Sequence, residues 1–174
     1  MIVMTANARS LSRPYTDPVP RSEMPGASSH PVNVGHLHLS ALASAPFWAR
    51  QYTRLFLAEC AGITEDTSQT AELIVSELVT NAARALAGDL AGREPSYSER
   101  VGLGVIRLSL RAFRDGLMIE VRDSSSEPPV LVRPDGEAES QRGLMIVDAL
   151  SEEWGYVPAP SGGKVVYSYL RLGG

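Results

Sequence analysis

The feature that most restricts the fold of this chain is a hairpin signal in its second half. Two segments that alternate between apolar and polar residues, 101–113 and 116–123, are joined by the turn Arg114-Asp115-Gly116. A connection this short can join antiparallel strands, whereas parallel strands need a crossover of about a dozen residues or more. The chain is therefore predicted to contain an antiparallel sheet.

The segments on either side of the hairpin predict helices and further strands. Helical periodicity is found in three segments, 46–62, 66–88 and 143–154. Alternation typical of strands is found at residues 36–42 and 164–172. The expected fold is α+β, a two-layer α/β sandwich in which helices cover one face of a mainly antiparallel sheet.

The first two helices have predicted start and core positions. Pro46 opens the first helix, and either Asp66 or Thr67 is expected to cap the second. The apolar stripe of the first helix is expected at Phe47, Tyr52, Leu55, Phe56 and Ala58. A partner surface on this helix is expected to include Phe47, Trp48 and Arg50, unless the two aromatic rings belong to the core.

The length of 174 residues and the apolar fraction of 44% suit a single domain. Residues 1–35 hold five prolines and show no period of 2 or 3.6, so a flexible N-terminal arm is expected there. The folded domain is expected at residues 36–172. Residues 88–100 and 124–141 also lack a period, and they are expected to form a polar loop and a lid.

Composition argues against several classes of protein. The one cysteine, Cys60, cannot form a disulfide within the chain or a thiolate zinc site. No apolar run reaches the length of about 18 residues that a membrane-spanning helix needs. His30, His36 and His38 lack a nearby acid or cysteine and are expected to be ordinary side chains, not metal ligands. A cytoplasmic protein without membrane contact is expected.

The net charge of −4 argues against direct nucleic-acid binding. An acidic domain without a basic stripe repels the phosphate backbone. Fifteen of the sixteen basic residues are arginine, and Lys164 is the only lysine. This bias carries no functional prediction.

The predicted second helix holds two candidate site residues, Glu77 and Asn81. They are four residues apart and therefore share one face of the helix. An amide oxygen can ligate Mg²⁺, and a neighbouring carboxylate can accept a proton from a hydroxyl group. The alternative, which the spacing alone favours, is a solvated helix face.

Asp123 ends the second strand of the hairpin and is followed by three serines, residues 124–126. A carboxylate in this place can accept a hydrogen bond from the exocyclic amine of adenine, whereas guanine presents a carbonyl that it would repel. The alternative is an Asx turn that ends the strand.

Two glycine signals point to a close approach of backbone and ligand. Arg142 and Gly143 stand at the start of the third helix, where free N–H groups favour a phosphate. Gly162 and Gly163 precede the last strand and either approach a ligand or form a plain turn.

Together, these segments resemble the sequence boxes of the GHKL ATPase superfamily. SELVTNAARAL resembles the N box, VRDSSSEPP the first glycine box, QRGLMIVDALSEEWGY the second and GGKVVY the third. The closest resemblance, over about residues 36–172, is to the bacterial anti-sigma factor serine/threonine kinases of the RsbW type.

The resemblance implies a Bergerat fold that binds ATP with Mg²⁺ and phosphorylates a serine or threonine of an anti-sigma factor antagonist with a STAS-type domain. It implies a sigma factor as a second partner, and a homodimer is compatible with it. By this resemblance Glu77 is the general base, Asn81 the Mg²⁺ ligand and Asp123 the adenine reader. Further nucleotide-binding residues are expected at Ser125, Arg142, Gly143, Leu144 and Gly163.

Three places depart from the pattern of the family. Ala85 stands where the family usually has histidine, and Val165 stands where it often has threonine. Ser140 and Gln141 stand where it often has two glycines, which restricts a loop that must wrap phosphates.

The alternative to a kinase is a non-catalytic module of the same fold that senses nucleotide or docks a partner. Retention of Glu77 and Asn81 favours the kinase, and the changed phosphate loop favours the module. A histidine-kinase catalytic domain is less favoured, because an arm of 35 residues is too short for a dimerising helical pair with a phosphoacceptor histidine. A Ser-His-Asp hydrolase would need a histidine after residue 38, and the chain has none.

Overall fold

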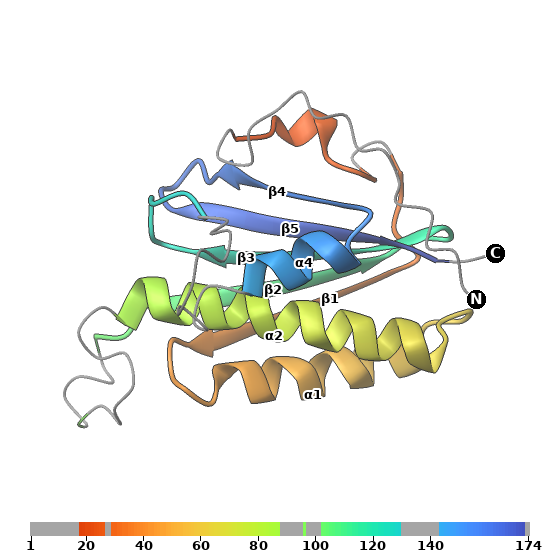
Figure 1. The fold of residues 1–174 in the computed structure, drawn as a ribbon, viewed down its shortest axis with the longest axis horizontal. Coiled ribbons are helices and arrows are strands. Elements are labelled where there is room, and N and C mark those ends of the chain that lie inside the picture. Colours follow the sequence, from red (N-terminus) through yellow and green to blue (C-terminus); the bar gives the residue numbers. More distant parts are fainter. Residues whose placement is uncertain (1–17, 27–28, 88–95, 97–101, 130–142, 173–174) are drawn as a thin grey trace.

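A computed structural model describes residues 18–26, 29–87, 96, 102–129 and 143–172. The helices of this part are η1 (Arg21–Glu23, a 3₁₀ helix), α1 (Ala45–Ala58), α2 (Glu65–Ala87) and α4 (Gly143–Leu150). The strands are β1 (Asn33–Ser40), β2 (Val105–Ala112), β3 (Gly116–Asp123), β4 (Glu153–Pro158) and β5 (Lys164–Arg171). The strands form one sheet in the order β1-β2-β3-β5-β4, in which all neighbours are antiparallel. Helices α1, α2 and α4 cover one face of this sheet (Figure 1), which confirms the expected α+β sandwich.

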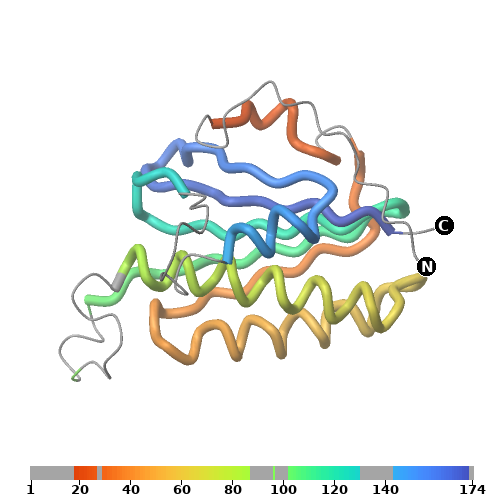
Figure 2. The backbone as a smooth tube through the Cα atoms, viewed as in Figure 1, coloured from red at the N-terminus to blue at the C-terminus, as the bar shows by residue number. Residues whose placement is uncertain are grey.

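The main core lies between the helices and the sheet. Helix α2 runs across the sheet with α1 on one side and α4 on the other (Figure 2). Both the helices and the strands give this core fully buried side chains, among them Ile74, Val75, Val79, Leu108, Leu110 and Ile119. The packing of α4 on α2 brings the start of α4 close to the middle of α2, where the candidate site forms.

A second, smaller cluster lies on the other face of the sheet. Here Met24 covers aromatic side chains of β5 such as Tyr167, and the N–H of Val19 donates to the C=O of Tyr156 on β4 at 2.8 Å. Strand β1 also begins three residues before the expected boundary of the domain. The described part of residues 1–35 therefore differs from the expected flexible arm, because its apolar side chains cover a face of the sheet that would otherwise be exposed.

Strand β4 lies where the third helix was expected to continue. Helix α4 ends at Leu150, and the four central residues of β4, Trp154 to Val157, are all buried. Residues of this strand belong to both clusters, so both of its faces are covered. A strand covered on both faces lacks the alternation that marks a strand in a sequence.

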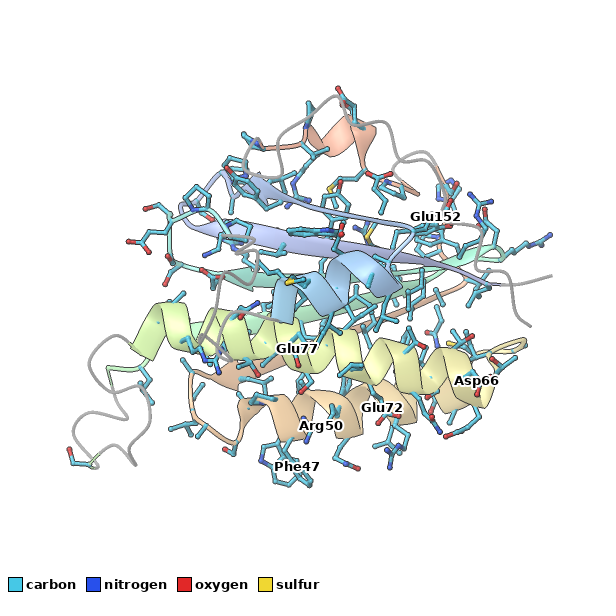
Figure 3. The ribbon with its side chains drawn as sticks, viewed as in Figure 1. Phe47, Arg50, Asp66, Glu72, Glu77 and Glu152 are labelled. Carbon is cyan, nitrogen blue, oxygen red and sulfur yellow. The ribbon has the colours of Figure 1, made fainter. Side chains whose placement is uncertain are left out.

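Helix α1 buries a different stripe from the expected one. Its buried side chains are Ala45, Ala49, Thr53, Phe56 and Leu57. Phe47 and Leu55 are 47% and 69% exposed, and Phe47 points away from the molecule (Figure 3). Small side chains let α1 lie close to α2, because the distance between helices depends on the residues at their contact. Phe47 and Trp48 therefore do not belong to the core.

The start of α2 also differs by a few residues from the expectation. The hydroxyl of Thr64 accepts the backbone N–H of Thr67 at 3.2 Å, so Thr64 is the cap instead of Asp66 or Thr67. Most of the expected loop at 88–100 and of the expected lid at 124–141 lies outside the described residues. Within the described ranges, no helix combines the length and the apolar character needed to cross a bilayer.

The outer face of the sheet carries a short basic row that the spacing in the sequence does not reveal. His38 on β1 is the direct neighbour of Arg107 on β2, which is the direct neighbour of Arg122 on β3. These residues lie far apart in the chain and are aligned only by the strand register. The row contains two formal positive charges, because histidine is counted as neutral at pH 7.

Candidate functional site

A cleft of about 470 Å³ lies between α2, the start of α4 and the strands β3 and β5. Apolar residues form much of its wall, among them Leu78, Ala82, Val121, Leu144 and Val166. Its polar side chains are Asn81, Arg84, Asp123, Glu127 and Lys164. The cleft therefore combines apolar walls with a few polar groups, as small-molecule sites do.

Asp123 lies at the end of β3 and is only 2% exposed. Its Oδ1 accepts hydrogen bonds from the backbone N–H of Ser125 at 2.8 Å and from Nζ of Lys164 at 2.9 Å. The first bond forms an Asx turn, the alternative that was open for this residue. The two roles are compatible, because the carboxylate that makes the turn also lines the cleft.

Lys164 is a residue of the cleft that the sequence analysis missed. It lies directly opposite Asp123 in the pairing of β3 with β5, and its side chain is 7% exposed. A buried ammonium group needs partners, and Nζ finds them in Asp123 and in the C=O of Ser125 at 3.3 Å. The only signal in the sequence was that Lys164 is the one lysine of the chain. Its pairing with Asp123 depends on the register of β3 and β5, which the sequence does not reveal.

Gly163 allows β5 to begin beside Asp123. Its φ is +77°, and a Cβ there would overlap the carbonyl oxygen of Asp123 and lie 2.7 Å from Cα of Ser124. Only glycine accepts both this conformation and this close contact. Gly163 therefore supports the position of Asp123 and Lys164, and it does not line the cleft itself.

The start of α4 lies directly against Glu77 and Asn81 of α2. A Cβ on Gly143, the first residue of α4, would overlap Oε2 of Glu77 and lie 3.6 Å from Nδ2 of Asn81. Glu77 lies beside the start of α4 in Figure 3 as well. The first N–H groups of a helix have no acceptor within it. A carboxylate, an amide and the first N–H groups of α4 thus lie together beside the cleft, which Asn81 and Leu144 line.

Of the remaining expected site residues, some line the cleft and others do not. Leu144 is 5% exposed and lines the cleft, as does Ala85. Ser125 and Val165 do not line it, and Val165 packs in the cluster on the other face of the sheet. The departure from the family threonine at Val165 therefore faces away from the cleft, although both of its neighbours in β5 line the cleft. Arg142 lies outside the described residues.

The donor set of the cleft fits Mg²⁺ only with help from a ligand. In the part of the chain that the structure describes, no group of three or more His, Cys, Asp or Glu could hold a metal ion. Mg²⁺ is usually bound by one or two protein oxygens together with phosphate oxygens and water. Asn81 can supply such an oxygen, and the apolar walls and Asp123 suit a flat ring that carries an N–H donor.

Comparisons with known proteins agree with this geometry. The sequence matches the model of the histidine kinase-like ATPase domain over residues 40–168. The fold is similar to the crystal structure of the RsbU and RsbW domains of Rv1364c from Mycobacterium tuberculosis, with a TM-score of 0.53, 22% identity and 82% of this chain covered. This chain spans 32% of the length of that one, and the similarity concerns the fold. No curated protein matches the sequence significantly.

The family match covers well over half of the chain and includes every residue that lines the cleft. An ATPase domain implies ATP binding. The chain belongs to the family of histidine kinase-like ATPase domains, in agreement with its GHKL sequence boxes.

Proposed function

We propose that the protein is a cytoplasmic anti-sigma factor that binds Mg·ATP in the cleft and phosphorylates a serine or threonine of an antagonist protein. The observation that carries the proposal is the contact of Gly143 with Glu77 and Asn81. The contact supports the proposal because a carboxylate that could accept a proton and an amide that could ligate Mg²⁺ both lie at the start of a helix. The fold is also similar to a structure that contains an RsbW domain.

The proposal gives each residue a separate task in binding. Asp123 accepts a hydrogen bond from the base, and Leu144 packs in the wall of the cleft. Asn81 supplies an oxygen ligand to Mg²⁺, which when bound neutralises charge on the phosphates. The free N–H groups at Gly143, together with Arg142, hold phosphate oxygens.

Glu77 acts in the transfer step by accepting the proton of the substrate hydroxyl. The hydroxyl oxygen forms a bond to the γ-phosphorus while the bond from that phosphorus to the β–γ bridging oxygen breaks, and ADP leaves. Phosphoryl transfer is accelerated mainly by positioning and charge neutralisation. The close packing of Gly143 on Glu77 keeps the proposed base near the helix start that holds the phosphates in this proposal.

The partner surface that we propose lies on α1. The rings of Phe47 and Trp48 are exposed, and they pack edge to face with centroids 5.2 Å apart. Arg50 donates from Nη1 to Oγ of Ser76 on α2 at 2.7 Å, which fixes α1 on its neighbour. Exposed aromatic side chains are enriched in protein interfaces. A sigma factor or the antagonist is the proposed partner.

The proposal is tested by separating binding from transfer with two variants. Asn81→Ala is expected to weaken Mg·ATP binding and to lower transfer with it, because it removes a metal ligand. Glu77→Ala is expected to leave binding nearly intact and to lower transfer by ~10² to 10⁴, the usual contribution of a positioned acid or base. The measurements are bound nucleotide and label transferred from γ-labelled ATP to a candidate antagonist.

Asp66→Ala is a matched control, because it removes an exposed carboxylate in the first turn of the same helix, away from Glu77 (Figure 3). It is expected to change neither measurement. Equal transfer by wild type and Glu77→Ala would remove Glu77 as the base. Nucleotide binding without transfer to any plausible antagonist would favour the non-catalytic module.

A further inference from the structure

The outer face of the sheet, opposite the cleft, has a basic hollow of about 290 Å³. Among the described residues, its lining includes one acid, Glu120, and four arginines, namely Arg21 of η1, Arg107 and Arg111 of β2, and Arg122 of β3. With histidine counted as neutral, four arginines and one glutamate give this lining a formal charge of +3, although the whole chain carries −4. Positive charge is thus concentrated at one place on an acidic protein.

Little of this charge is neutralised by acidic side chains. Glu120 binds Arg111, with Nη2 of the arginine 2.7 Å from Oε2 of the glutamate. Nη2 of Arg122 donates to the hydroxyl of Ser161, which is uncharged. Arg107 is exposed and makes no hydrogen bond or ion pair with the described residues. A guanidinium group has five N–H donors, so the hollow holds many donors and few acceptors.

The strand register places two of these arginines side by side. Arg107 and Arg122 are direct neighbours on β2 and β3, and adjacent strands lie about 4.8 Å apart. Like charges in this position destabilise a sheet. The same two residues also line a second hollow of about 420 Å³, whose lining includes Ser161 and Gly162. An anion between the two guanidinium groups would replace their repulsion with two attractions.

We propose that this basic hollow binds an anion of the phosphate type, with two negative charges, between Arg107 and Arg122. Guanidinium groups bind phosphate oxygens through pairs of parallel N–H···O bonds. A dianion neutralises both groups, whereas a carboxylate carries one charge only. The first hollow has room for a phosphate group, and the second has room for the rest of a small phosphorylated molecule. The site lies on the other face of the sheet from the cleft and does not depend on the proposed function.

Nuclear magnetic resonance of the ¹⁵N-labelled protein tests the proposal by titration with sodium phosphate, at constant ionic strength and mildly alkaline pH. The backbone amides of Arg107, Ser109 and Glu120 report on the hollow, and those of Gly143 and Leu144 report on the cleft. Saturable shifts are expected in the first group, with a dissociation constant of ~1 mM or below, the scale of two or three charged hydrogen bonds. Sodium acetate is expected to bind there ~10-fold more weakly or worse, because it neutralises only one charge.

Two variants connect the binding to the arginine pair. Arg107→Met and Arg122→Met are each expected to weaken phosphate binding about 10-fold or more, the scale of one lost charged hydrogen bond. Arg107 is exposed, so its replacement is expected to leave the fold intact, and the spectrum of the free variant checks this. If Arg122→Met does not fold, Arg107→Met alone decides.

Arg114→Met is the matched control. It removes the same charge from an exposed side chain in the turn of the same hairpin, at the opposite end from Arg107 and Arg122. Its dissociation constant for phosphate is expected to equal that of wild type. A loss of affinity in this control as large as in Arg107→Met would show that net charge, and not the arginine pair, determines binding, and would overturn the proposal.

The remaining outcomes are also decisive. The proposal is overturned if the amides of the hollow do not shift at ~20 mM phosphate, or if acetate shifts them equally. It is also overturned if Arg107→Met binds phosphate as wild type does. Shifts confined to Gly143 and Leu144 would overturn it and would support a phosphate site at the start of α4 instead. A protein that binds phosphate in the hollow but no ATP would contradict the proposed function and leave this proposal intact.

Discussion

Two glycines set the distances within the site. Gly143 brings the start of α4 onto Glu77, and Gly163 brings the start of β5 onto the backbone of Asp123. In both places a side chain would occupy space that a functional residue or its backbone already fills. The geometry of the site therefore depends on these two glycines as much as on its functional side chains.

Gly162 and Gly163 form a matched pair for testing this effect. Both have positive φ, +87° and +77°, but a Cβ on Gly162 would meet nothing within 4 Å. Gly162→Ala is expected to cost about 1 kcal/mol of unfolding free energy from backbone strain alone. Gly163→Ala is expected to cost a further 1 to 3 kcal/mol or so from overpacking, and to weaken nucleotide binding as Asp123 shifts. Urea denaturation and calorimetry measure the two effects, and equal costs would contradict the contact with Asp123.

Residue types and spacing predicted some site residues but not others. The pair Glu77 and Asn81 could be found because i, i+4 spacing on one helix implies a shared face whatever the tertiary structure is. Lys164 could not be assigned, since it meets Asp123 only through a strand pairing that spans 41 residues of sequence. Contacts within one element can be predicted from the sequence, whereas contacts between elements depend on register.

The same limit applies to whole elements. The hairpin of β2 and β3 was predicted, because its turn and the alternation of β2 are local signals. Strand β4 was missed, because burial on both faces removes its alternation. The stripe of α1 was misplaced, because alanines fill its contact and large apolar side chains such as Leu55 are left exposed.

Strands β2 and β3 also create a repulsion that can be measured. Arg107 and Arg122 are direct neighbours, and like charges in this position destabilise a sheet. Arg107→Glu replaces this repulsion with an attraction and is expected to raise the unfolding free energy by roughly 0.5 to 1 kcal/mol in low salt. The gain is expected to shrink in 1 M salt, where the screening length is about 3 Å.

Arg107→Thr is the control for this prediction. It removes the repulsion and adds no attraction, so its stability in urea denaturation is expected to fall between those of wild type and Arg107→Glu. A variant Arg107→Glu that is no more stable than wild type in low salt would show that the two guanidinium groups turn away from each other.

At the scale of the whole molecule, the sheet separates the face that forms the cleft from an outer face whose packing contributes to stability. The helices on one face form the main core and the cleft, while the other face is covered in part by residues 18–26. Side chains on the two faces of the sheet belong to separate clusters. A substitution on the outer face is therefore expected to lower the free energy of unfolding without changing the shape of the cleft. The two faces can therefore be tested separately.

Met24 is the residue that tests this separation. It is 6% exposed and packs against the outer cluster, which includes Phe113 and Tyr167. Met24→Ala is expected to lower the unfolding free energy by about 2 kcal/mol, the low end of the range for a buried methionine, and to leave the nucleotide affinity of the folded protein unchanged. Val32→Ala, at a side chain 63% exposed, is the control and is expected to change neither. Urea denaturation monitored by tryptophan fluorescence measures the first quantity and calorimetric titration the second. Unchanged stability of Met24→Ala would mean that residues 18–26 are not part of the cooperative unit, and that this unit begins near the start of β1 at Asn33.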